Sequence, residues 1–143
     1  MANELQLPTA EAYEIADSFA QASARILDFR VTNRSSLSDG ESTDLEKCED
    51  SLDHMVVLFR GYGIRLIGAG AQEAVSELKS AIVLGKETIA KVNKIKKVIK
   101  IAGALVDLAV ALLAKDPQGL LAAATGVRTA AEGSKGEGET QEG

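Results

Sequence analysis

The sequence is poor in the residues on which many catalytic, metal-binding and base-stacking sites depend. Its 143 residues include one cysteine, one histidine and no tryptophan, and aromatic residues make up 3% of the chain. A lone cysteine cannot form an intramolecular disulfide, and a thiolate zinc site would need ligands that this chain lacks. With so few aromatic rings, there is also little to stack on nucleic-acid bases.

The single cysteine and the single histidine do not combine into a site. Cys48 and His54 lie six residues apart, which places them on different faces of a helix, and neither has a partner at the i, i+4 spacing of zinc-binding helices. The glycine-rich stretch 60–70 matches neither common phosphate-binding motif, and close packing or a hinge explains it better. We therefore predict no enzyme, no catalytic, cofactor-binding or metal-ligating residue, and no small-molecule substrate.

Two kinds of membrane-targeting segment are missing as well. The first residues contain no basic region followed by an apolar run, so the sequence shows no ordinary secretory signal. A membrane-spanning helix needs about 20 residues largely free of charge. Lys100, Asp107 and Asp116 interrupt each such window. These observations predict a soluble, intracellular protein, with peripheral membrane association or signal-less secretion as alternatives.

What the sequence does contain is helical periodicity. Hydrophobic residues make up 45% of the chain and recur at steps of three and four, which is typical of amphipathic helices. Thr9 starts the first helix, a capping box of Thr43 and Glu46 starts the second, and Asp116 with Pro117 separates the last two. The predicted helices span residues 9–33, 43–69, 71–115 and 117–131.

These helices predict an all-α fold, an antiparallel four-helix bundle that forms one domain over 1–131. The third helix, 71–115, would be about 65 Å long at 1.5 Å per residue, which is too long for a domain of this size. We therefore expect a kink near Gly85, with this helix at or near the centre. Residues 132–143 have no apolar side chain to bury and are predicted to be a disordered acidic tail.

Charge is divided unevenly along the chain, although the net charge is only −5. Residues 1–55 hold 12 acidic and 4 basic residues, whereas residues 56–128 hold 5 acidic and 11 basic residues. The basic face of the third helix consists of Lys86, Lys91, Lys94, Lys96, Lys97 and Lys100. It is either a solvated face neutralised by the acidic helices or a contact surface for an anionic membrane. Nucleic acid is disfavoured, because no aromatic residues are interleaved with the lysines.

The segment that follows the lysines is apolar nearly all round. Residues 101–114 include Asp107 as their only charge, so this stretch needs cover on every side, and the fourth helix repeats the pattern. The candidate contact residues are Ile101, Leu105, Leu108, Leu112, Leu120 and Leu121. Their cover could come from the other helices of the chain, from further copies or from a bilayer.

From this apolar excess we predict a non-enzymatic helical interaction or assembly protein. It self-associates, or binds a helical partner, through the apolar part of the third helix and the fourth helix. The alternative is a membrane-active protein that exposes a basic and apolar hairpin, residues 86–127, to anionic lipid.

Overall fold

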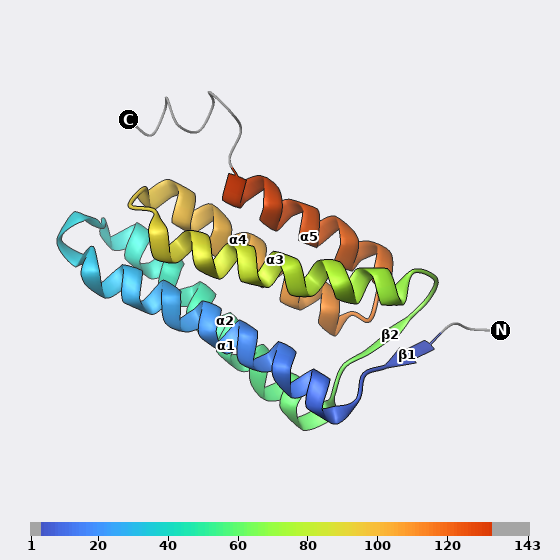
Figure 1. The fold of residues 1–143 in the computed structure, drawn as a ribbon. Coiled ribbons are helices and arrows are strands. Elements are labelled where there is room, and N and C mark those ends of the chain that lie inside the picture. Colours follow the sequence, from blue (N-terminus) through green and yellow to red (C-terminus); the bar gives the residue numbers. More distant parts are fainter. Residues whose placement is uncertain (1–3, 133–143) are drawn as a thin grey trace.

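The protein is an all-α molecule with five α-helices, as seen in a computed structural model that describes residues 4–132. The elements in chain order are β1 (Glu4–Gln6), α1 (Thr9–Thr32), the 3-10 helix η1 (Arg34–Ser36), α2 (Asp39–Tyr62), β2 (Arg65–Ile67), α3 (Ala71–Lys91), α4 (Ile95–Leu113) and α5 (Pro117–Glu132). Helices α1 and α2 form one layer, and α3, α4 and α5 form the other (Figure 1). The all-α class expected from the sequence is confirmed, and the predicted acidic tail after Glu132 lies outside the described residues.

The first helix lies within one residue of the expected range, but the second begins earlier than expected. Ser38 Oγ accepts a hydrogen bond from the Glu41 amide at 3.1 Å, and Glu41 Oε1 accepts one from the Ser38 amide at 2.9 Å. This capping box, and not the predicted one at Thr43 and Glu46, starts α2. The two pairs have the same spacing, but Leu37, next to Ser38, packs against the core and fixes where the chain enters the helix.

The second helix also ends earlier than predicted, at Tyr62, because the chain turns at Gly63 (φ 79°) into a short strand. Strand β2 pairs antiparallel with β1, with Leu5 opposite Leu66. Within β2 the side chain of Leu66 is buried, while its two neighbours are exposed. Strands of three residues are too short to leave a recognisable alternation in the sequence, so this two-stranded sheet was missed.

The predicted third helix is in fact two helices, so the bundle has five helices and the expected four-helix arrangement is wrong. Helix α3 ends at Lys91, Val92 is extended (φ −95°, ψ 154°), and α4 starts at Ile95. The break lies at residues 92–94 and not at Gly85. Asn93 is a weak helix former and lies among lysines that repel one another along a continuous helix. Folding back at this point also buries the apolar part of α4 against the rest of the chain.

Gly85 serves close packing instead of a bend. A Cβ atom at this position would lie 3.1 Å from a methyl group of Leu105 in α4 and 3.3 Å from a methyl group of Val127 in α5. Such distances are at the short limit of van der Waals contact. The absence of a side chain therefore allows α3 to approach both neighbouring helices closely.

An ion pair joins the two helices of the first layer. Arg30 on α1 donates two hydrogen bonds to the carboxylate of Glu49 on α2, at 2.7 and 2.9 Å. Glu49 is only 7% exposed. The hydrogen bond to Glu49 is the main reason why the pKa of the Arg30 guanidinium is raised. Two parallel charge-assisted bonds fix the register of α1 against α2.

Replacing Gly85 tests the close approach of α3 to α4 and α5. Gly85→Leu should lower the free energy of unfolding by about 1 to 3 kcal/mol, because the added atoms must displace Leu105 and Val127. Gly126→Leu is the matched control, since Gly126 is exposed on α5 with open space around it. There the better helix propensity should raise stability by up to about 1 kcal/mol. Denaturant unfolding measures both, and equal effects would contradict the packing role.

Candidate functional site: the basic α3–α4 turn

The structure places the predicted apolar contact residues inside the single chain. Ile101, Leu105, Leu108 and Leu120 are each 0% exposed, and Leu112 is 2% exposed. Leu121 is half-buried against the core. Helix α4 packs against all four other helices of the same chain, which supply the cover that its sequence requires. Ile101, Leu105, Leu108 and Leu120 therefore belong to the core, and they reach a partner only if the bundle opens.

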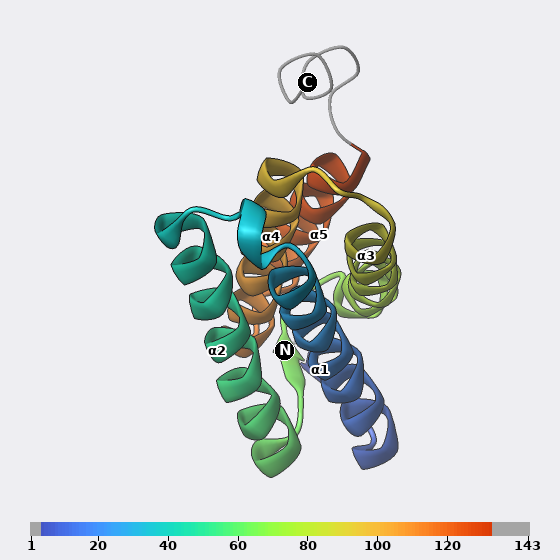
Figure 2. The same cartoon turned by 90° about the vertical axis from the view of Figure 1, so that its left-hand side faces the viewer.

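The predicted basic face, in contrast, gathers at one end of the bundle. We call residues 91–100 the basic turn. Its five lysines are Lys91, Lys94, Lys96, Lys97 and Lys100. In Figure 2 the end with the α1–α2 and α3–α4 connections faces the viewer. Among residues 4–132, none of these five lysines has a carboxylate within 4.0 Å. Lys86 lies one turn earlier and donates a hydrogen bond to Gln21 on α1 instead.

The position of the lysines at the start of α4 makes their mutual repulsion more costly. Lys94 is the N-cap residue, Lys96 and Lys97 occupy the first turn, and that turn contains no acidic residue. A helix N-terminus carries partial positive charge and is stabilised by anions. Helices α1, α2 and α3 each follow this rule with an acidic residue in the first turn. The start of α4 is therefore a place where a bound anion would relieve an unfavourable charge arrangement.

Apolar side chains accompany the lysines. Val92, Ile95 and Ile99 are partly buried and pack against the core, whereas Val98 between them is fully buried. Lys91, Lys96 and Lys100 are exposed. The turn thus presents cations to solvent above a partly accessible apolar base, which is the composition of surfaces that meet lipid head groups.

Neither Cys48 nor His54 adds a reactive group to this surface. Burial raises the pKa of the Cys48 thiol, and the carboxylates of Asp44, Glu49 and Asp107 raise it further. The thiol therefore stays protonated near neutral pH and is a poor nucleophile. His54 is exposed on α2. Within the described chain, no three histidine, cysteine, aspartate or glutamate side chains are grouped so that they could hold a metal ion.

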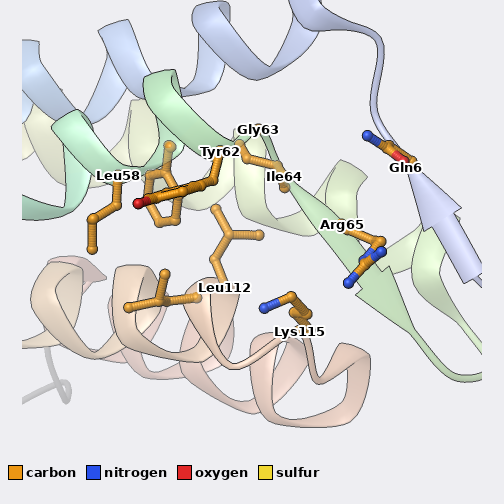
Figure 3. A pocket seen from close by; sticks show the side chains of 10 residues that line it. Gln6, Leu58, Tyr62, Gly63, Ile64, Arg65, Leu112 and Lys115 are labelled. Atoms are coloured by element: carbon orange, nitrogen blue, oxygen red, sulfur yellow. The ribbon is translucent and has the colours of Figure 1, made fainter.

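A second feature was not predicted, a cleft of about 370 Å³ between the C-terminal ends of α2 and α4 (Figure 3). Its wall combines Leu58, Tyr62 and Leu112 with the cationic side chains of Arg65 and Lys115. These residues come from α2, β2, α4 and the α4–α5 turn. No local motif could have revealed the cleft, because its parts meet only after the two layers pack together.

Comparison with models of known protein families, with curated proteins and with solved structures found no match. In residues 4–132, no helix has both the length and the apolar character that crossing a bilayer requires. The geometry of the basic turn is therefore the basis on which we propose a function.

A pair of substitutions on α4 separates core from surface. Leu108→Ala should lower the free energy of unfolding by about 2 to 5 kcal/mol, because it leaves a cavity in the middle of the bundle. Val110→Ala, two residues away on the exposed side of the same helix, should change stability by less than about 0.5 kcal/mol. Thermal unfolding of the two variants gives the comparison. A small effect of Leu108→Ala would show that this face of α4 is not core.

Proposed function

We propose that this chain is a non-enzymatic helical protein that binds anionic membrane surfaces through its basic turn while the bundle stays folded. The observation that carries the proposal is the set of five lysines at one end of the molecule that have no ion-pair partner within residues 4–132. The apolar base of the turn and the N-terminus of α4 support it, since both favour contact with head groups.

The energies are sufficient for reversible binding. A lysine near an anionic bilayer contributes about 1 kcal/mol, so five lysines favour the bound state by about 5 kcal/mol, more than a thousandfold in partitioning. The attraction falls off within a Debye length, about 8 Å at physiological salt. Binding should therefore be peripheral and sensitive to salt.

The charge of the remaining surface gives the bound molecule an orientation. Residues 1–55, which form most of the α1–α2 layer, carry 12 acidic and 4 basic residues. An anionic surface repels this layer and attracts the basic turn. Because the α1–α2 connection lies at the same end of the bundle (Figure 2), we expect the molecule to tilt so that the α3–α4 connection faces the membrane and the α1–α2 layer is directed away from it.

A lipid surface suits the turn better than nucleic acid. Nucleic-acid surfaces of this kind pair cations with aromatic rings that stack on bases. The side chains between the lysines are Val92, Asn93, Ile95, Val98 and Ile99. Aliphatic groups beside cations match the boundary between head groups and acyl chains.

Docking does not require release of the hairpin 86–127. In the folded chain the leucines of that segment are buried, so releasing it would expose core side chains to water unless a bilayer received them. Peripheral docking is the first step of either membrane-bound state, and it is the step that the exposed lysines support.

Vesicle binding with matched charge variants tests the proposal. Lys96→Gln/Lys100→Gln should weaken binding to vesicles rich in phosphatidylserine by about thirtyfold, because two exposed lysines of the turn are lost. Arg25→Gln/Lys47→Gln makes the same change in net charge on exposed positions of α1 and α2, and should have little effect. Cosedimentation at low and at physiological salt measures both.

Three outcomes would contradict the proposal. The wild-type protein could fail to bind anionic vesicles at low salt, it could bind phosphatidylcholine vesicles equally well, or both double variants could lose the same affinity. Tighter binding to a single-stranded oligonucleotide than to the vesicles would assign the turn to nucleic acid.

Self-association is the second candidate function, and exposed apolar side chains on α4 favour it. Val110 is 51% exposed and Leu113 is 41% exposed, one helical turn apart, although most of α4 is buried. A contact between copies would cover them. Neither residue was among the predicted contact residues, although both lie in the apolar segment 101–114 from which a contact was predicted.

Sedimentation of a concentration series tests self-association. The wild-type protein should form oligomers as its concentration rises. The double variant Val110→Glu/Leu113→Glu should stay monomeric over the same range, because association would bury two charges at the contact. Val57→Glu is the control, since Val57 is 65% exposed on α2, outside the proposed contact. A wild-type protein that stays monomeric at high concentration excludes this function.

A further inference from the structure

The cleft between the ends of α2 and α4 contains a lysine in a conformation that normally belongs to glycine. Lys115 has φ 66°, and it is the one non-glycine residue with positive φ in the described part of the chain. This left-handed region is unfavourable for residues with a Cβ atom, and helices commonly end with glycine there. Lysine therefore replaces the residue that is usual at this position, and its side chain is the feature that sets it apart.

The backbone of Lys115 explains the conformation but not the side chain. Its amide donates to the carbonyl of Leu112 at 3.1 Å and so closes the end of α4. Its carbonyl accepts a hydrogen bond from the Ile67 amide at 2.9 Å, which ties the α4–α5 turn to β2. Glycine would make both bonds without strain. What lysine adds to glycine at this position is a side chain that ends in an amino group.

The surroundings of this amino group are divided into a cationic and an apolar part. Arg65 and Lys115 lie on one side of the cleft, and Leu58, Leu112 and the Tyr62 ring lie on the other (Figure 3). Arg65 is paired with Glu4 at 3.2 Å. Lys115 is half-buried and has no carboxylate within 4.0 Å among residues 4–132. Of these two cationic residues, Lys115 is thus the one that has both a strained backbone and no carboxylate partner within residues 4–132.

We propose that this cleft binds a small molecule that has an apolar body and a carboxylate, of the fatty-acid class. The carboxylate lies against the Lys115 ammonium group, and the apolar body lies along Leu58, Leu112 and Tyr62. The volume of about 370 Å³ is within the range of small-ligand sites. Tyr62 is 85% exposed, so its ring is available to cover such a ligand.

This site is separate from the basic turn. Lys115 follows the last residue of α4, whereas the basic turn includes the first turns of that helix. An α-helix of this length separates its two ends by about 28 Å at 1.5 Å per residue. Ligand binding in the cleft and membrane docking at the turn can therefore succeed or fail independently.

Titration with decanoate, followed by NMR or calorimetry, tests the proposal. Decanoate should bind the wild-type protein, while decanol and acetate, which each lack one half of the ligand, should bind at least about tenfold more weakly. Lys115→Gln, which removes the charge and keeps a side chain, should weaken decanoate binding by about tenfold. Lys96→Gln, in the basic turn, should leave it unchanged.

A glycine variant separates the ligand role from a structural one. Lys115→Gly should lose the same affinity and should also raise the melting temperature by roughly 2 to 6 °C, because the strain is relieved. No binding of decanoate, equal binding of decanol, or unchanged affinity in both Lys115 variants would overturn the proposal. A lower melting temperature for Lys115→Gly would overturn the claim of backbone strain on which it depends.

Discussion

Burial of the apolar face of α4 is the constraint on which the rest of the structure depends. The fully buried residues of α4, such as Ile101, Leu105 and Ala109, lie on one broad face of the helix, whereas Val110 on the opposite face is 51% exposed. Helix α4 packs against every other helix of the chain, so this face is covered from several directions. The turn at residues 92–94 and the absence of a side chain at Gly85 both serve this burial. The turn folds the chain back, and the lack of a side chain at Gly85 lets α3 approach α4 and α5 closely.

The sequence predicts the helical class, and the bounds of α1 and α5 to within one residue, because apolar spacing is a local signal. The Asp116 cap of α5 is present, whereas α1 follows Pro8 with no side-chain cap, so Thr9 does not act as the predicted cap. The sequence does not reveal the break at 92–94, since the spacing of apolar residues by three and four continues from Thr88 through Val92 to Ile99 without interruption. The packing of α4 into the second layer adds to the weak helix propensity of Asn93 and the repulsion among the lysines, and together they stop the helix there. Tertiary burial outweighs local propensity at this point.

The candidate site was predicted in part. The lysines are visible in the sequence as an exposed cluster, but the apolar residues beside them could not be assigned to core or surface without the fold. Whether five helices of one chain suffice to cover Leu108 depends on distances between layers, which composition does not encode. The cleft at Lys115 is still less accessible to sequence reasoning, because a positive φ at a lysine leaves no trace in residue spacing.

The ion pairs elsewhere in the bundle explain why the lysines of the basic turn have no carboxylate partner within residues 4–132. The acidic side chains of α1 and α2 that make ion pairs do so with basic residues elsewhere, for example Glu49 with Arg30 and Glu11 with Lys79. Glu77 on α3 pairs with Arg128 on α5. These pairs join neighbouring helices along the body of the bundle. Within residues 4–132, the lysines of the basic turn take no part in such pairs.

The pairing of β1 with β2 determines at which end of the bundle β1 lies. Because Glu4 lies opposite Ile67, the chain enters the fold at the end of the bundle remote from the α3–α4 connection (Figure 1). If the protein is attached to a sensor surface through a tag placed before residue 4, the lysines of the basic turn consequently face the solution.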